Sequence, residues 1–173
     1  MERRLTERRL IVLRHAKSDW GTDAPTDHAR PLNKRGRRDA PKVAAGICQL
    51  GWTPEYVLSS DSKRTRETYQ RMSKVFGEAL GREPVVQFLE SLYHAGPAAL
   101  ESALADVPDE ISTVMAIGHN PGWAEVVYWL TGQSIHMTTA NAALLSTDAE
   151  HWSDAVGRAG FCELVDVIRP KEL

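Results

Sequence analysis

Short runs of apolar residues recur along the chain, and apolar residues in the segments between them repeat at helical spacing. The runs cover residues 10–13, 56–58, 85–89, 113–117, 142–145 and 164–168. Runs of this length, bounded by polar and turn-forming residues, indicate strands. Their alternation with helical segments predicts an α/β fold.

Start and stop signals place the helices. The first helix is expected to begin near Asn33 and to end at Gly51, with Pro41 kinking or interrupting it. Its inward residues, at helical spacing, are Val43, Ile47 and Leu50. A second helix is expected after Ser62, with Arg64 in its first turn. Two shorter helices are expected, one from residue 97 to about 107 and one from Asn120, its cap, to Gly132, its stop.

Polar residues directly follow three of the predicted strands. Arg14 and His15 follow the first run, a Ser- and Thr-rich segment with Arg64 follows the second, and His119 follows the run at 113–117. In open α/β sheets, the loops that leave the carboxyl ends of parallel strands face one crevice. We therefore expect these four side chains to converge.

This set of side chains suits phosphate chemistry. Neutral imidazole can attack phosphorus near neutral pH, which makes His15 the candidate nucleophile. Arg14 and Arg64 can hold phosphate oxygens without losing their charge, and His119 can add a hydrogen bond, above all when protonated. The start of the second helix, with its free amide groups and dipole, favours an anion beside Arg64.

Composition limits the other possibilities. The 173 residues, 42% hydrophobic and 25% charged, suit a single domain over 1–173, with residues 1–8 as a flexible extension. The net charge of −2 predicts no affinity for nucleic acid or membrane, so any positive potential must be local. Cys48 and Cys162 are expected to be free thiols, since their spacing matches neither a disulfide framework nor a zinc site. The first apolar run is too short for a signal peptide, which predicts a cytoplasmic protein.

The motif order adds a family resemblance. The order of the motifs resembles that of the histidine phosphatase superfamily. It is a strand followed by Arg14 and His15, then a strand followed by two serines, Arg64 and Thr68, then a strand followed by a glycine and His119. Residues 30–33 and 137–140 are similar to its small SixA branch of phosphohistidine phosphatases. The resemblance implies a phosphoglycerate mutase-like fold, three-layered α/β/α with a mainly parallel sheet. It also implies a phosphohistidine intermediate on His15. The arginines supply the positive charge, so no metal or other cofactor is expected.

The general acid is not assigned by the resemblance. Mutase-like relatives carry a Glu after the third strand, whereas Ser91 takes that place here, with Glu90 one residue earlier. Glu90 and Asp19 are the candidate acids, and His94 is a further one. The imidazole of phosphohistidine leaves more easily than an alkoxide, so a missing acid favours a phosphohistidine substrate.

Other residues near the motifs are candidates for substrate contact. Arg30 resembles the Arg of the Arg-Pro-Leu pattern in the SixA branch, and it is equally well interpreted as a solvated loop arginine. Lys17 and Ser18 can donate to phosphate or cap the loop behind His15. Residues 19–29 are the longest irregular stretch and the candidate for a mobile rim. A basic run, which comprises Lys34, Arg35, Arg37 and Arg38, is typical of a solvated helix face.

Three functions are compatible with these residues. The first is a phosphatase that removes phosphate from phosphohistidine on a protein, such as a phosphotransfer domain in signalling. The second is a general phosphatase for small phosphomonoesters. The third is a phosphate-binding module without catalysis, which the presence of His15 disfavours because a binder needs only the arginines.

Overall fold

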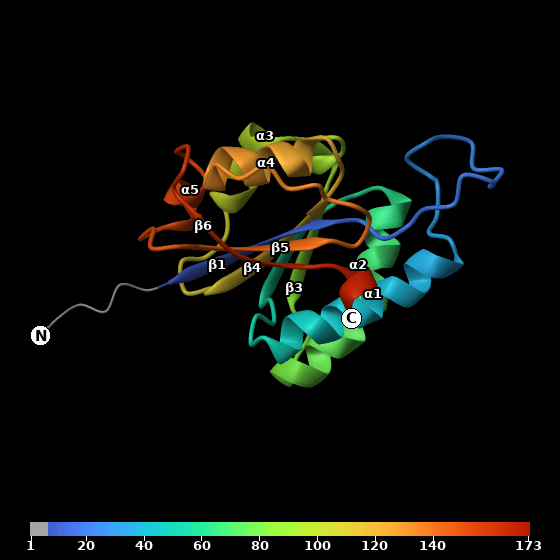
Figure 1. The fold of residues 1–173 in the computed structure, drawn as a ribbon, viewed down its shortest axis with the longest axis horizontal. Coiled ribbons are helices and arrows are strands. Elements are labelled where there is room, and N and C mark those ends of the chain that lie inside the picture. The colour runs from blue at the N-terminus through green and yellow to red at the C-terminus, as the bar shows by residue number, and fades with distance from the viewer. Residues whose placement is uncertain (1–6) are drawn as a thin grey trace, which may run out of the picture.

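The sheet has six strands in the order β3-β2-β4-β1-β5-β6 (Figure 1). The strands are β1 (Arg8–Arg14), β2 (Tyr56–Ser60), β3 (Val85–Leu89), β4 (Thr113–Gly118), β5 (Ala142–Thr147) and β6 (Glu163–Ile168). In this computed structural model, which describes residues 7–173, β1 to β4 are parallel and β5 runs against both of its neighbours. All six predicted strands and the mainly parallel sheet are confirmed.

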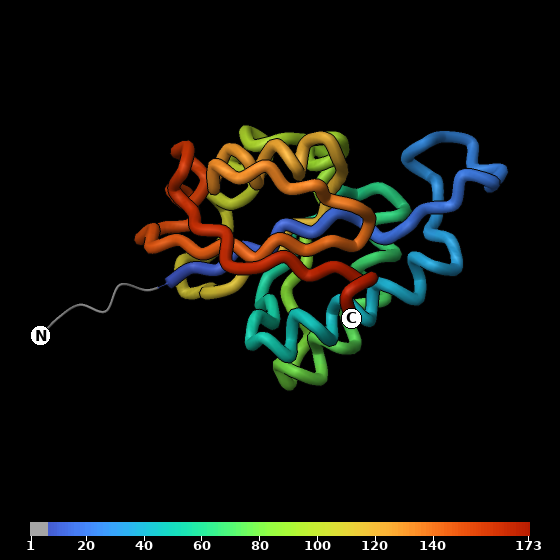
Figure 2. The backbone as a smooth tube through the Cα atoms, viewed as in Figure 1, coloured from blue at the N-terminus to red at the C-terminus, as the bar shows by residue number. Residues whose placement is uncertain are grey.

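Helices cover both faces of the sheet. One face carries α1 (Lys34–Gln49) and α2 (Lys63–Leu80), and the other carries α3 (Pro97–Leu104), α4 (Gly122–Thr131) and the short α5 (Trp152–Ala155) (Figures 1 and 2). Two 3-10 turns, η1 (Glu90–Leu92) and η2 (Pro170–Glu172), complete the elements. This is the expected three-layer α/β/α arrangement. Within residues 7–173, no helix is long and apolar enough to span a bilayer.

The two cores lie on opposite faces of β1. Leu10 and Val12 pack with α3 and α4, whereas Ile11 and Leu13 pack with α1 and α2. Successive side chains of a strand point to opposite faces, so a continuous apolar run is what a strand buried on both sides requires. Burial on both faces holds β1, and with it the end that bears Arg14, at the centre of the sheet.

The first helix departs from expectation. The helix begins next to Asn33, as predicted, and the Asn33 side chain caps it by accepting from the Gly36 N–H, but α1 runs through Pro41 without a break. Burial of Ala40, Val43 and Ala44 against the sheet outweighs the hydrogen bond that proline cannot donate. The helix ends before Gly51, so Leu50 lies in the cap and is 51% exposed, and its predicted burial is wrong.

The remaining expectations hold with small shifts. Ser62 caps α2 and Gly81 ends it in the left-handed conformation, whereas α3 ends at Leu104, earlier than predicted. Gly132 ends α4 as predicted, but Pro121 takes the cap position, and the Asn120 side chain accepts from the first turn. The first six residues of the expected extension lie outside the described residues. The expected extension is wrong at Arg8, which is buried within β1.

Candidate active site

The strand register brings two histidines together at the carboxyl edge of the sheet. Arg14 of β1 is paired with Gly118 of β4, so the next residues, His15 and His119, are neighbours. Their ring centroids lie 5.3 Å apart. The parallel pairing of β2 with β4 places Ser60 alongside, and the Ser60 Oγ lies 2.8 Å from the His119 Nε2. Sheet geometry alone therefore assembles this part of the site.

His15 is held as a neutral base with one nitrogen free. Its Nδ1 lies 2.7 Å from the Ala16 carbonyl, which can only accept, so Nδ1 carries the proton and donates. Burial, helped by the charges of Arg64 and Arg14, lowers the pKa of His15 to about 3 against the opposing effect of this hydrogen bond. Near neutral pH the Nε2 lone pair is therefore available for attack.

His119 is also neutral. Burial, together with the fields of His15 and Arg64, lowers its pKa to about 2. This state departs from the expectation that protonation would strengthen its hydrogen bond. Its Nδ1 is buried without a hydrogen-bond partner among the described residues, while the Ser60 hydroxyl faces Nε2. If Ser60 donates to Nε2, Nδ1 bears a proton that can be given to a bound anion.

Arg14 and Arg64 present unused donors. The Arg14 Nη1 donates to the Met137 carbonyl at 3.0 Å, and the Arg64 Nη1 donates to the Asp27 carbonyl at 2.8 Å. The Nε of each arginine is buried and has no partner among the described residues. Burial, together with the charge of Arg64, lowers the pKa of Arg14, as expected for two cations that share a site.

A rim carboxylate lies against these cations. The Asp27 Oδ2 accepts from the Arg64 Nη2 at 3.0 Å and from the Tyr93 hydroxyl at 2.5 Å, and its Oδ1 accepts from the Arg30 Nη2 at 3.0 Å. The hydrogen bond from Tyr93, with those from both arginines, holds the pKa of Asp27 well below its usual range. The Asp27 carboxylate is thus an anion already bound to Arg64 and Arg30.

Asp27 and Tyr93 were not predicted from the sequence, and His94 was predicted only as an additional acid. The His94 ring centroid lies 5.0 Å from that of His119, and its Nε2 lies 3.3 Å from the Asp27 Oδ2. His94 also has a positive φ of 52°, which is uncommon outside glycine and clusters at functional sites. Asp27 lies in an irregular loop and Tyr93 just after η1, so no periodic pattern marks either one.

The other predicted residues lie at varying depths around the site. Arg30 is buried, not solvated: it donates to Asp27 and to the Ser18 hydroxyl, and its guanidinium stacks on Trp20, 3.5 Å from the ring centroid. Lys17 is half-buried, and its carbonyl accepts from the Asn33 N–H.

The two acids predicted first, Glu90 and Asp19, make no hydrogen bond or ion pair with the four central residues in the described part of the chain. Glu90 is exposed on η1, and Asp19 accepts from the Gly21 N–H in the rim. Residues 19–29 are irregular, as expected, and their mobility stays a prediction. Trp123 is fully buried in the core and donates to the Ala116 carbonyl.

The assembled groups suit a tetrahedral anion. Three buried polar atoms have no hydrogen-bond partner among residues 7–173: the Arg14 Nε, the Arg64 Nε and the His119 Nδ1, from the residues grouped with His15. Buried donors without partners are costly, so their presence points to a ligand that accepts hydrogen bonds. Within residues 7–173, no three His, Cys, Asp or Glu side chains gather in a way that could hold a metal ion.

The chain is similar to proteins of one known family. Residues 10–87 match the model of the histidine phosphatase superfamily (branch 1). A chloroplastic protein of Arabidopsis thaliana, itself uncharacterised, is 42% identical over 163 residues, which are 88% of this chain and 72% of that protein.

Solved structures show the same fold. A protein of Nakamurella multipartitia, provisionally named the phosphohistidine phosphatase SixA, superposes with a TM-score of 0.79 at 26% identity, over 95% of this chain and 96% of its own. The protein histidine phosphatase SixA complexed with tungstate gives a TM-score of 0.76 at 21% identity, over 95% and 98% of the two chains.

Proposed function

Because this chain belongs to the histidine phosphatase superfamily, in its SixA-type branch, we propose that it removes phosphate from phosphohistidine on a protein. Phosphatase activity as such follows from the family. The observation that carries the proposal is the neutral, buried His15, whose Nε2 shares a site with three buried polar atoms that have no partner among the described residues.

The reaction has two steps. The His15 Nε2 attacks phosphorus, an Nε2–P bond forms, and the P–N bond to the leaving imidazole breaks as that nitrogen gains a proton. A water oxygen then forms a bond to phosphorus, the Nε2–P bond breaks, and the water gives up a proton. Arg14 and Arg64 stabilise the negative charge on the equatorial oxygens in both steps, and the His119 Nδ1 adds a hydrogen bond.

His94 is the proton donor that best fits the site. Its ring lies beside His119, half-exposed at the mouth of the site, and Asp27 can hold its Nε2. Asp27 itself is too acidic to donate a proton near pH 7. The Tyr93 ring and the neutral His119 ring lie against this imidazole, with centroids 4.1 and 5.0 Å from that of His94. The role is that of a general acid for leaving groups that need one.

A protein substrate suits the open edge of the site. Between β3 and β4 the chain forms only η1, α3 and short loops, so no long insertion encloses the catalytic edge. The surface of a folded phosphoprotein can therefore reach His15. Signalling through a phosphotransfer domain, and a cytoplasmic location, are parts of the proposal that follow from this substrate and from the sequence.

Dephosphorylation of a phosphohistidine protein tests the proposal. Wild type, His15→Asn and the matched surface control His136→Asn are incubated with a phosphotransfer domain that carries phosphate on histidine. We expect release of phosphate by wild type and the control, and none above background by His15→Asn. Acid-labile, base-stable label on wild type would mark the intermediate. Undiminished activity of His15→Asn, or faster turnover of sugar phosphates than of the phosphoprotein, would contradict the proposal.

A further inference from the structure

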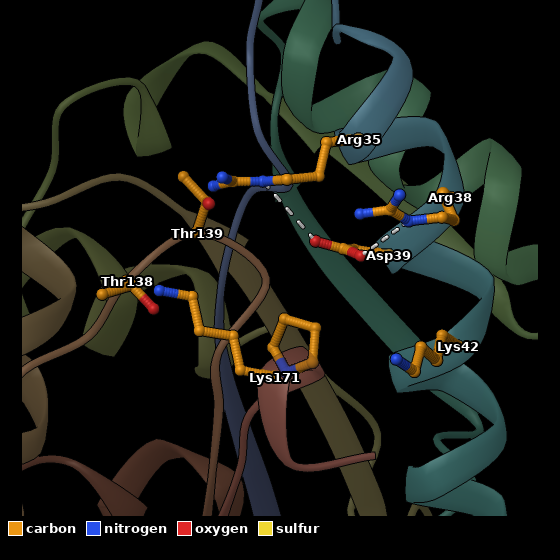
Figure 3. Close-up of a pocket in the computed structure, with 8 residues that line it drawn as sticks. Arg35, Arg38, Asp39, Lys42, Thr138, Thr139 and Lys171 are labelled. Atoms are coloured by element: carbon orange, nitrogen blue, oxygen red, sulfur yellow. Dashed lines mark ion pairs between the residues drawn. The ribbon is translucent and has the colours of Figure 1, made fainter.

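A second cluster of positive charge lies in a cavity beside the catalytic edge. The cavity has a volume of about 360 Å³ and is formed by α1, by the loop before β5 and by η2 (Figure 3). Four cationic side chains and one carboxylate line it: Arg35, Arg38, Lys42, Lys171 and Asp39. A chain with a net charge of −2 thus concentrates positive charge at one concave place.

These cations are poorly neutralised. The Nε atoms of Arg35 and Arg38 lie 3.9 and 3.6 Å from the Asp39 carboxylate, which makes both ion pairs long. Within residues 7–173, Lys42 and Lys171 form no ion pair. Like charges brought together in this way repel each other, and an acidic partner would relieve the repulsion.

The cavity differs from an ordinary basic helix face because separate elements converge on it. In Figure 3 the Arg35 side chain extends from α1 toward Thr139, and the Lys171 side chain extends from η2 toward Thr138. Arg169, next to η2, ties this segment to the loop by donating to the Asn141 side chain at 2.5 Å. Part of the basic run of α1 thus lines a concave site that three segments share.

A short loop separates the cavity from the candidate active site. Thr138 and Thr139 line the cavity, and the residues on either side of them contact the catalytic strand. The Met137 carbonyl accepts from Arg14, and the Ala140 N–H donates to the carbonyls of Arg14 and His15. The same loop therefore contacts Arg14 and His15 through Met137 and Ala140 and lines the cavity through Thr138 and Thr139.

We propose that this cavity docks acidic side chains of the protein substrate while its phosphohistidine lies at His15. This inference rests on the proposed function and adds a recognition element to it. The exposure of the cations favours a protein surface over an enclosed small ligand, since the Arg35 and Arg38 side chains are 49% and 72% exposed. Such contacts guide encounter and register more than they add affinity.

Charge reversal away from the chemistry tests the docking. The variant Arg38→Glu/Lys171→Glu is compared with Lys74→Glu/Arg71→Glu, a matched control on the exposed side of α2. With the phosphohistidine protein at low ionic strength, we expect kcat/KM to fall about tenfold in the cavity variant. The control should stay near wild type, and hydrolysis of a small aryl phosphate should be unchanged in both. Added salt should shrink the difference.

A binding measurement separates this inference from the proposed function. Fluorescence anisotropy of a labelled hexaglutamate peptide measures docking without catalysis, and we expect binding to wild type that the cavity variant loses. If wild type fails to hydrolyse the phosphohistidine protein but the peptide still binds through the cavity, the proposed substrate is wrong and the acidic docking site stands. Equal peptide binding by both double variants, or equal kcat/KM on the phosphoprotein, overturns the docking site.

Discussion

Replacing His15 by Asn should make the stability of the protein less sensitive to mild acid while it abolishes catalysis. The folded state keeps His15 neutral down to its pKa of about 3, whereas an unfolded histidine gains a proton near pH 6.5. Below pH 6.5 the unfolded state therefore binds more protons, and wild-type stability falls as pH falls. Asn removes this linkage, and its side-chain amide can still donate to the Ala16 carbonyl.

The size of the effect follows from the pKa difference. The pKa of His15 is 6.5 in the unfolded chain and about 3 in the folded protein. This difference lowers the free energy of unfolding of wild type by about 2 kcal/mol when the pH falls from 7 to 5. The histidine is only 6% exposed, so solvent screening takes away little of this amount. Wild type should lose about 2 kcal/mol more than His15→Asn over this interval.

Urea denaturation at pH 7 and pH 5 measures the difference. Histidine NMR adds a direct control, because the Asp109 carboxylate raises the pKa of the exposed His151. We expect His151 to titrate above the ordinary histidine range while His15 keeps its Nδ1–H tautomer from pH 5 to 8. Equal pH dependence in wild type and variant, or titration of His15 between pH 6 and 7, would refute the reasoning.

Three further changes probe the site. His94→Gln should slow hydrolysis of phenyl phosphate roughly 100-fold, because its leaving group has a pKa of about 10 and needs a proton. Turnover of phosphohistidine should stay near wild type. Equal losses on both substrates would exclude His94 as a general acid. Gly36→Ala would place a Cβ 2.2 Å from the Lys17 carbonyl oxygen, so urea denaturation should show a loss of about 1–3 kcal/mol; unchanged stability would mean that α1 can move. Asp27→Asn should strengthen product inhibition by phosphate several-fold, because it removes the anion at Arg64; weaker inhibition would show that Asp27 helps to bind phosphate.

The sequence predicts the sheet and the convergence at its edge for one physical reason. Apolar runs must be buried on both faces, and the carboxyl ends of parallel strands share an edge, so residues that follow such strands meet. The positions of His15 and His119 follow from this rule, since Arg14 is paired with Gly118. Arg64 follows from the helix that begins after β2.

The residues that escaped prediction depend on packing between loops. Asp27 reaches Arg64 across 37 positions of the sequence, and Tyr93 reaches Asp27 across 66. No periodicity marks such contacts. The helix is not interrupted at Pro41 for a related reason, because tertiary burial of the residues around it decides whether the helix continues.

The Asp27 carboxylate gives the site a resident competitor. An incoming phosphoryl group must displace the Asp27 carboxylate from Arg64. The inorganic phosphate that remains after hydrolysis competes with the same carboxylate. Because Asp27 belongs to the same chain, its carboxylate competes for Arg64 at a fixed effective concentration that does not depend on the concentration of the protein. When the Asp27 carboxylate binds the Arg64 guanidinium again, it would help to release the product. Tight binding of the divalent phosphate by two arginines then need not limit turnover.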